Sequence, residues 1–385
     1  MSSPLKVGLI GCGVISHIYL TTLRRSHLVE VVACGALDQS QAEARAREFG
    51  IAEVKSPDEI ITDPGIEAIL NLTIPAAHAD ITRKALLAGK HVYCEKPFVT
   101  DWREGAALLE LAETKGLLLG NAPDTFLGGR WQTVQRLISE GAIGAPTGVS
   151  AFVGTHGVER HHPNPDFYYQ TGGGPLLDLG PYYLTAMVVC LGPLARVAGM
   201  SRRTFAQRQI ESQPRAGEWM DVEVDTHVNA LLAFERGPIG TMTMSFDVWD
   251  SQTPRLEIYG EEGSICIPDP DPVFGANVFG GEVWIRHRET SRWTYQPRKP
   301  GHEHWQVAEN HHGFNDNSRG LGLIDLAVAL NEGRQPRASG ALANHVVEAM
   351  HGILTSQTTG QFWAMDSSCT LVPPLPENFA ADVLS

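Results

Sequence analysis

The first third of the chain alternates short apolar runs with longer amphipathic stretches. Strands are predicted at residues 6–10, 29–34, 68–73, 91–94 and 117–120, where apolar side chains follow one another. Helices are predicted at residues 41–49, 77–88 and 103–114, which have helical spacing and close on glycines. Strands that alternate with helices form a buried parallel sheet, so we expect residues 1–123 to be a doubly wound α/β domain.

The pattern changes after residue 123. A helix is predicted at residues 131–139, a loop rich in Gly, His and Pro spans residues 154–174, and another helix is expected from about residue 181 to 191. Strands then dominate, at residues 222–234, 240–249, 255–259, 264–267 and 283–287, before helices at residues 321–331 and 341–356. Successive strands of this kind predict a large, mostly antiparallel open sheet. Residues 124–385 are therefore expected to form an α+β domain.

A glycine-rich turn links the first predicted strand to a helix expected from about Ile15. Its sequence is Gly11-Cys12-Gly13-Val14-Ile15-Ser16. Gly11 permits a tight turn, Gly13 lets a phosphate approach the backbone, and the helix N-terminus offers free N–H groups to a pyrophosphate. A glycine pattern alone could be only a tight turn. Its place between two strands at a normal interval favours a nicotinamide dinucleotide, NAD or NADP, as the ligand.

The choice between NAD and NADP stays open in the sequence. A carboxylate for the ribose hydroxyls is expected about 20 residues after the third small residue of the turn. Ala36 occupies that position. Asp38, two residues later, is a candidate for the ribose, and it is equally well explained as the N-cap of the next helix.

Two further motifs carry a resemblance to a known family. They are Cys94-Glu95-Lys96-Pro97 and Gly172-Gly173-Gly174-Pro175-Leu176-Leu177-Asp178-Leu179-Gly180-Pro181-Tyr182. With them the chain resembles, over nearly its whole length, the glucose-fructose oxidoreductase, inositol dehydrogenase and rhizopine catabolism (Gfo/Idh/MocA) family. Supporting segments are residues 73–75 with His78, residues 122–126, and residues 337–339 with His345. The resemblance implies an N-terminal Rossmann dinucleotide-binding domain followed by a substrate-binding and oligomerisation domain.

The resemblance also implies a catalytic set of Lys96, Asp178 and Tyr182, with Lys96 directed toward the nicotinamide. Many family members have histidine in place of Tyr182 and aspartate in place of Thr185, whereas the glucose-fructose oxidoreductase and dihydrodiol dehydrogenase branches are similar to this chain in using tyrosine. Oxidation of an alcohol needs a base for the hydroxyl proton while hydride leaves the carbon. Because a phenol ordinarily titrates near pH 10, a cation such as Lys96 must stabilise the phenolate, and Asp178 would orient the groups.

Simpler explanations exist for these residues. Lys96 could lie in a solvated turn at a strand end, and Asp178 could only cap a helix that begins near Pro181. Tyr182 competes with its neighbour Tyr183, because one of the two must face the core. The register of the motif favours Tyr182.

Two sets of binding residues are expected. For the cofactor they are Gly11, Gly13, Val14, Ile15, Asp38, Thr73, Pro75, His78, Glu95 and Lys96. The polar and aromatic residues 156–169 suit a sugar ring, whose hydroxyls need polar partners and whose C–H faces pack on aromatic rings, although an ordered loop would look the same. For the substrate the set is Lys96, His162, Asn164, Asp166, Asp178 and Tyr182, with Trp249, Arg319 and His345 as further candidates.

Composition narrows the class of protein. The charges, 30 basic against 44 acidic, are dispersed and sum to −14, which argues against nucleic acid as a partner. Six scattered cysteines predict neither disulfides nor a cysteine zinc site, and they fit a cytoplasmic protein. No segment approaches the roughly 18 apolar residues of a membrane helix, so no membrane partner is expected. Histidines 156, 161, 162, 302, 304, 311 and 312 lack ligands at a fixed spacing, so no metal is expected.

Three functions are compatible with these residues. The first is an NAD(P)-dependent oxidoreductase that acts on a secondary alcohol or ketone of a sugar, polyol or glycoside derivative. The second is a catalytically silent sugar or dinucleotide sensor, as the galactose-regulon repressor is among relatives. The third is an NAD-dependent glycosidase of the same family. Retention of Lys96, Asp178 and Tyr182 favours the enzyme.

The expected open sheet also predicts an assembly. An exposed sheet face favours association, so we expect a homo-dimer or homo-tetramer.

Overall fold

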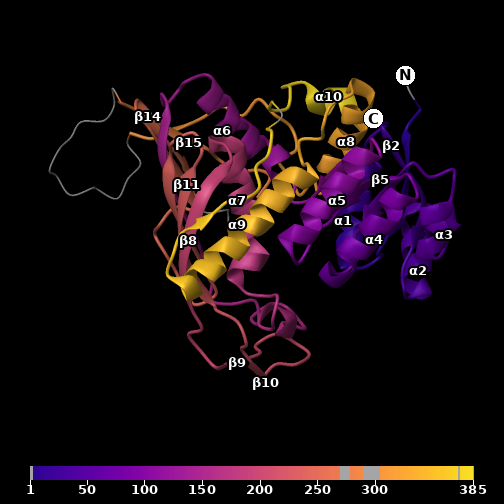
Figure 1. Cartoon of the computed structure of the whole chain (residues 1–385), viewed down its shortest axis with the longest axis horizontal. Coiled ribbons are helices and arrows are strands. Elements are labelled where there is room, and N and C mark those ends of the chain that lie inside the picture. The colour runs from indigo at the N-terminus through magenta and orange to yellow at the C-terminus, as the bar shows by residue number, and fades with distance from the viewer. Residues whose placement is uncertain (1–2, 269–277, 289–303, 372, 385) are drawn as a thin grey trace.

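The computed structural model describes residues 3–268, 278–288, 304–371 and 373–384, which contain two large sheets and one two-stranded sheet (Figure 1). The first sheet has six parallel strands in the order β3-β2-β1-β4-β5-β6. Their bounds are β1 Leu5–Ile10, β2 Val29–Gly35, β3 Glu53–Val54, β4 Ala68–Asn71, β5 His91–Cys94 and β6 Leu119–Asn121. The predicted parallel sheet is confirmed. Strand β3 has only two residues, too few for a sequence pattern to predict it.

Five helices connect these strands. They are α1 Val14–Leu23, α2 Gln39–Phe49, α3 Pro57–Thr62, α4 Pro75–Leu87 and α5 Trp102–Thr114. Local signals explain several of their ends: the side chain of Asp101 caps α5, a Ser56–Glu59 capping box starts α3, and Gly50 ends α2 in the left-handed conformation. The helix α3 was not predicted, because six residues are too few for a clear period.

The second sheet has nine strands in the order β16-β15-β14-β13-β7-β12-β11-β8-β17. The bounds are β7 Pro146–Gly154, β8 Leu194–Arg202, β11 His227–Phe234, β12 Ile239–Ser245, β13 Leu256–Gly260, β14 Gly263–Ile267, β15 Trp284–His287, β16 Gln306–Val307 and β17 Trp363–Ala364. All neighbours are antiparallel except β7 and β12, so the predicted mostly antiparallel sheet is confirmed. A small hairpin of β9 Gln207–Gln209 and β10 Trp219–Asp221 stands apart from it.

Strands β7 and β8 are not predicted by the sequence pattern, and β11 begins later than predicted. β7 starts with proline and holds two glycines, and β8 lacks a strict alternation of buried and exposed residues, so neither has a clear strand pattern. Residues 222–226 had been predicted as strand. There Glu223 N donates to Tyr169 O in the loop before α7, and Thr226 N donates to Arg202 O at the end of β8.

Helices of the second half join the two sheets. They are α6 Gly129–Ser139, α7 Pro175–Leu191, α8 Leu321–Glu332, α9 Gly340–Thr359 and α10 Phe379–Val383. The long α9 contacts β8 of the second sheet and also α5 and β6 beside the first sheet, and it runs diagonally between the two parts in Figure 1. Asn121 N donates to Ala338 O, and Ser26 Oγ donates to Val383 O, so the C-terminal segment is bonded to the N-terminal part. None of the helices in the described ranges is long and apolar enough to cross a membrane.

The start of α7 differs from the prediction. The helix begins at Pro175, not near Pro181, because Gly174 with φ 94° forms the N-cap and Pro175 occupies the first helical position. Pro181 lies inside the helix. Asp178 is therefore a residue of the first helical turn, and the alternative in which it caps a helix near Pro181 is wrong.

Candidate active site

The chain brings two segments together at the carboxyl edge of the first sheet. Lys96 lies two residues after the end of β5, and Asp178 lies in the first turn of α7. Lys96 Nζ donates to the Asp178 carboxylate at 3.0 Å and to the Asp178 carbonyl oxygen at 3.2 Å. The ends of parallel strands in a doubly wound sheet form the crevice where ligands bind. The structure thus places the Cys94–Pro97 motif and the start of α7 in one site.

Lys96 is held in its charged form. Burial by itself lowers the pKa of Lys96, but the charges of the Tyr182 phenolate and of the Asp178 and Glu95 carboxylates outweigh it, and the net effect raises the pKa. The side chains of Lys96 and Asp178 are 19% and 20% exposed, so the pair is only weakly screened by solvent. Lys96 therefore acts as a fixed cation in this site, and the solvated-turn alternative does not describe it.

The structure separates the two candidate tyrosines. Tyr182 is partly exposed in the site, and Lys96 Nζ lies 5.2 Å from the centre of its ring. Tyr183 is 7% exposed and belongs to the hydrophobic core. The side chain at position 182, and not its neighbour, thus faces Lys96.

Arg319 provides a second cation at Tyr182. Its Nη2 donates to Tyr182 Oη at 3.4 Å, and its guanidinium carbon lies 5.9 Å from the ring centre. The buried carboxylate of Asp124 fixes the turn that carries Arg319, because Asp124 Oδ2 accepts from the N–H groups of Gly320 and Gly322 at 2.8 and 2.9 Å. Sequence reasoning gave Arg319 only as a further substrate contact. Arg319 and Tyr182 are 137 residues apart, so no local sequence pattern could predict that they pair.

The residues of the glycine turn fit a dinucleotide. Gly11 has φ 103°, and a Cβ there would lie 2.4 Å from Leu72 O, so only glycine is accommodated. A Cβ on Gly13 would meet nothing within 4 Å, which leaves open space in front of the turn. No side chain caps α1, and Val14 is 93% exposed, so the first N–H groups of the helix face that space. This cradle suits a pyrophosphate, with Ile15 following Val14 in the first turn.

The other predicted cofactor residues lie along the same edge. Pro75 begins α4, which also lacks a side-chain cap, and the Thr73 hydroxyl donates to Asn71 Oδ1 at 2.7 Å. His78 is fully buried, with Nδ1 2.6 Å from Pro97 O and Nε2 3.0 Å from Thr73 O. It therefore holds the loops after β4 and β5 together and has no exposed surface for direct contact with a cofactor. Glu95 is 8% exposed and accepts from the Tyr19 hydroxyl at 3.0 Å.

Asp38 caps α2. Its carboxylate accepts from the backbone N–H of Ser40 at 3.0 Å, and the hydrogen bonds of Ser40 and Gln41 lower its pKa. The side chain is exposed to solvent. The N-cap explanation is thus confirmed, and contact with a ribose remains a prediction.

The polar loop before α7 contains the predicted substrate residues. His162 Nδ1 accepts from the backbone N–H of Asn164 at 3.1 Å, which orients the imidazole. Both carboxylate oxygens of Asp166 bind Arg215, and this hydrogen bonding lowers the pKa of Asp166. Asp166 is therefore used to hold the loop. Tyr168, which sequence reasoning did not select, is half-buried; burial raises the pKa of its phenol, and the charge of Asp178 raises it further.

Two further candidates have structural partners. The His345 imidazole is fully buried, where Nε2 accepts from Leu194 N at 2.9 Å and Nδ1 lies 2.9 Å from the Ser367 hydroxyl. Trp249 is 71% exposed and stacks on His156 with ring centroids 3.3 Å apart. Of these two, only Trp249 has free surface for a ligand.

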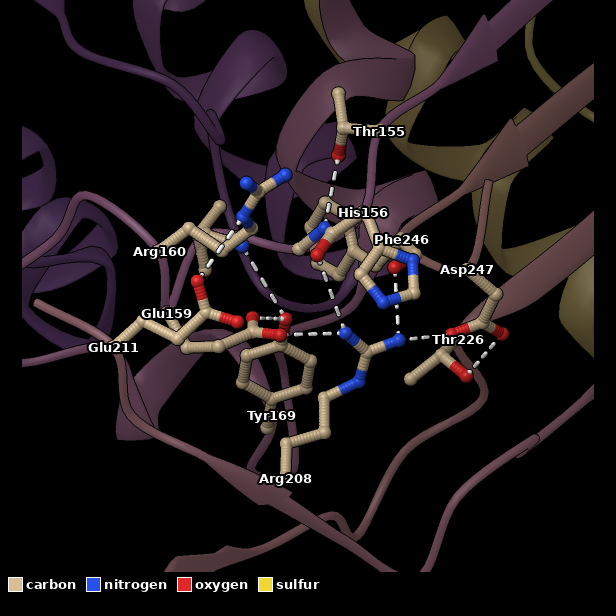
Figure 2. Close-up of polar contacts among 12 residues, drawn as sticks. Thr155, His156, Glu159, Arg160, Tyr169, Arg208, Glu211, Thr226, Phe246 and Asp247 are labelled. Atoms are coloured by element: carbon tan, nitrogen blue, oxygen red, sulfur yellow. Dashed lines mark hydrogen bonds and ion pairs between the residues drawn. The ribbon is translucent and has the colours of Figure 1, made fainter. Parts of the chain in front are cut away.

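A buried ionic network anchors the polar loop (Figure 2). Arg208, from β9, lies between Glu159 and Asp247; its Nη1 donates to Glu159 at 2.6 Å, and its Nη2 bonds to Asp247. All three side chains are less than a tenth exposed. The Tyr169 hydroxyl donates to Glu159, and the Asp247 carboxylate accepts from Thr226 at 2.7 Å. The network therefore joins the loop, the β9–β10 hairpin and the end of β12.

Histidines do not gather into a metal site within the described ranges. No group of three or more His, Cys, Asp or Glu side chains there is arranged to hold a metal ion. His302 lies outside the described residues. His311 pairs instead with Glu309 and Glu377.

The dinucleotide cradle and the cation-flanked tyrosine define a nicotinamide-dependent oxidoreductase. The chain belongs to the Gfo/Idh/MocA family: the model of the oxidoreductase family with an NAD-binding Rossmann fold matches residues 5–122, and that of the GFO/IDH/MocA C-terminal domain matches residues 131–266. The predicted family and enzyme class are confirmed.

Proteins similar in sequence to this chain include a reductase and a dehydrogenase. The chain is 30% identical to a dTDP-3,4-didehydro-2,6-dideoxy-alpha-D-glucose 3-reductase of Saccharopolyspora spinosa, over 69% of this chain and 75% of that protein. It is 28% identical to the trans-1,2-dihydrobenzene-1,2-diol dehydrogenase of Bos taurus, with the same coverage of 69% and 75%.

Solved structures share the fold. A levoglucosan dehydrogenase in complex with NADH superposes with a TM-score of 0.78 at 20% identity, over 94% of this chain and 100% of that chain. An NAD binding oxidoreductase from Klebsiella pneumoniae gives a TM-score of 0.79 at 20% identity, over 95% and 100%. At this identity the likeness concerns the fold alone.

Proposed function

We propose that the protein transfers hydride between a nicotinamide dinucleotide, NAD or NADP, and a secondary alcohol or ketone of a sugar, polyol or glycoside derivative. The observation that carries this proposal is the cluster of Lys96, Asp178, Tyr182 and Arg319 at the carboxyl edge of the first sheet. A phenol flanked by two cations suits proton exchange with an alcohol oxygen. Names of relatives that act on a dTDP-sugar and on a dihydrodiol support an alicyclic or sugar-like substrate.

Each residue of the cluster has one task in this mechanism. When bound, the nicotinamide accepts or donates the hydride. Tyr182 Oη takes the proton of the substrate hydroxyl during oxidation and returns it during reduction. Lys96 and Arg319 stabilise the phenolate, and the Asp178 carboxylate keeps Lys96 in position through the 3.0 Å hydrogen bond.

Further assignments belong to the same proposal. The N-termini of α1 and α4, with Gly11, Gly13, Val14, Ile15, Thr73 and Pro75, bind the dinucleotide, and Asp38 and Glu95 lie nearby. His162 and Asn164 contact the substrate. Residues 1–123 and 124–385 act as the dinucleotide-binding and substrate-binding domains. Six free cysteines support a reducing, cytoplasmic location.

The outer face of the second sheet supports assembly. Met200, Leu231 and Ile239 lie on this face, on neighbouring strands, and are 73%, 51% and 67% exposed. Apolar side chains in such a row favour association of two copies through the sheet, as a homo-dimer or within a homo-tetramer. Sedimentation analysis tests this, and a monomer at micromolar concentration would contradict it.

The activity itself is tested with purified protein, NAD or NADP and a panel of sugars, polyols and glycosides. Formation of reduced cofactor is the expected result. The variant Lys96→Met should lose about 100-fold or more in kcat, whereas Lys115→Met, at an exposed position after α5, should not. Dinucleotide binding without turnover would favour a sensor, and glycoside hydrolysis without net cofactor change would favour a glycosidase.

A further inference from the structure

A small cavity lies where the segments at the ends of β5 and β6 meet α7 and α9. Its lining includes Lys96, Asn121 and Thr185, and the other lining residues are apolar. The cavity has a volume of about 10 Å³, which is about the space that one water molecule needs. A larger ligand does not fit there.

Two polar side chains of this cavity are buried without a partner. Asn121 and Thr185 are 3% and 2% exposed. Among the described residues, neither Asn121 Oδ1 nor Thr185 Oγ1 has a hydrogen-bond partner, although Asn121 Nδ2 donates to Ala122 O. Burial of an unpaired polar atom costs free energy, so native proteins nearly always supply a partner, and an ordered water molecule is a common one. Both atoms therefore need a ligand that can form hydrogen bonds.

The two residues belong to the two segments that form the catalytic cluster. Asn121 is the last residue of β6, next to the strand β5 that leads to Lys96. Thr185 lies on α7, three residues after Tyr182 and seven after Asp178. Residues at these spacings share one face of a helix. A ligand that joins Asn121 to Thr185 thus links the first sheet to the face of α7 that carries the catalytic residues.

We propose that the cavity binds one water molecule, held by Asn121 Oδ1 and Thr185 Oγ1, which fixes α7 against the end of β6 and so sets the position of Tyr182 relative to Lys96. Asn121 and Thr185 are then positioning residues. Water can donate to the amide oxygen and form a second hydrogen bond with the hydroxyl, whereas a metal cation is disfavoured because Lys96 lines the same cavity. The role in positioning rests on the proposed function, but the water site does not.

A high-resolution crystal structure tests the water directly. One water molecule is expected within about 2.7–3.2 Å of both Asn121 Oδ1 and Thr185 Oγ1. Thr185→Val replaces the hydroxyl by a methyl group of similar size, and the water should be lost from that variant. A dry cavity in the unchanged protein would overturn the proposal, and so would a water that persists in Thr185→Val. Contacts of about 2.4 Å would identify a metal ion and would contradict it as well.

Kinetics test the role in positioning. In Thr185→Val, kcat should fall about 10-fold, because Tyr182 is held less firmly beside Lys96. For the same reason the rise of kcat/KM for alcohol oxidation should move to higher pH. Thr185→Ser keeps the hydroxyl and should retain both properties. Thr133→Val is the matched control: Thr133 is buried in α6 and donates to Gly129 O at 2.8 Å within its own helix, so kcat should not change. An unchanged kcat and pH profile in Thr185→Val would refute the role in positioning.

Failure of this inference can be told apart from failure of the proposed function. If NADH binds but no sugar, polyol or glycoside is turned over, the proposed function fails, and the crystal structure still decides whether the water is bound. If turnover is normal and the cavity is dry, only the inference fails. Should Thr185→Val not fold, Asn121→Leu takes its place, because it removes the other partner and should also lose the water; a water retained in Asn121→Leu would count against the site.

Discussion

Arg319 donates a hydrogen bond to the hydroxyl of Tyr182 at 3.4 Å, although the two residues are 137 positions apart. Lys96 Nζ lies 5.2 Å from the centre of the same ring, so two cations flank the phenol. Because Lys96 is largely buried, water screens its charge only weakly. Burial lowers the pKa of Arg319, but the charge and hydrogen bond of Tyr182 outweigh it and raise the pKa overall. Arg319 is thus a positioning residue for the phenol.

Removal of Arg319 should change the pH dependence of the reaction. In Arg319→Gln the phenolate loses one of its two cations, so the rise of kcat/KM for alcohol oxidation should move to higher pH. Arg319→Lys keeps the charge and should restore part of the shift. The measurement is kcat/KM against pH for the three proteins. A pH profile that is identical in Arg319→Gln would mean that Arg319 serves only the local fold.

The adjacent tyrosines provide a matched pair of variants. Tyr182→Phe should lower kcat by about 100-fold or more, because the proton-transfer group is lost and the ring is kept. Tyr183→Phe removes the same atom from a side chain that is 7% exposed and packed in the hydrophobic core, and it should leave kcat within about threefold. Steady-state kinetics of both proteins, with NADH affinity as the control for folding, test the assignment. The reverse order of effects would assign proton transfer to Tyr183.

Loss of Arg208 should destabilise the fold. Arg208→Met leaves the buried carboxylates of Glu159 and Asp247 without their cation, and one-sided removal of a buried pair costs about 3–5 kcal/mol. Arg288→Met is the control, because its pair with Glu262 is exposed and should contribute less than about 1 kcal/mol. Denaturant unfolding of the variants measures both. An equal decrease in the free energy of unfolding in both variants would show that burial does not make the Arg208 network more important for stability than the exposed pair.

The stability of the protein should fall in mild acid through His345. Burial lowers the pKa of His345, so the unfolded chain binds a proton near the ordinary pKa of about 6.5 and the folded chain only at lower pH. Stability is therefore complete above about pH 6.5 and is lost below it, by at most about 1.4 kcal/mol per pH unit. The free energy of unfolding should depend less on pH between about 5 and 7 in His345→Gln than in the unchanged protein. An identical slope would exclude His345 as the cause.

The sequence by itself determined the elements with strong local signals. Runs of buried strand residues, helical spacing and glycine stops predicted the parallel sheet and its main helices, because these features depend on neighbours in the chain. The glycine turn and the Cys94–Pro97 motif likewise indicated the cofactor class and Lys96. Strands β7 and β8 were not predicted, because their alternation is weak and tertiary pairing decides them. The early start of α7 at Pro175 was not predicted either, because a glycine N-cap decides it.

Only the tertiary structure decided which side chains share the site. The register of the motif favoured Tyr182, but a residue's direction depends on helix phase and on packing. The fold therefore had to place Tyr183 in the core and to give His78 and Asp166 supporting roles. Arg319 reaches Tyr182 because the turn before α8, held by Asp124, comes to the carboxyl edge of the first sheet. Contacts between residues so far apart arise from burial of a common core, and no local pattern in the chain encodes them.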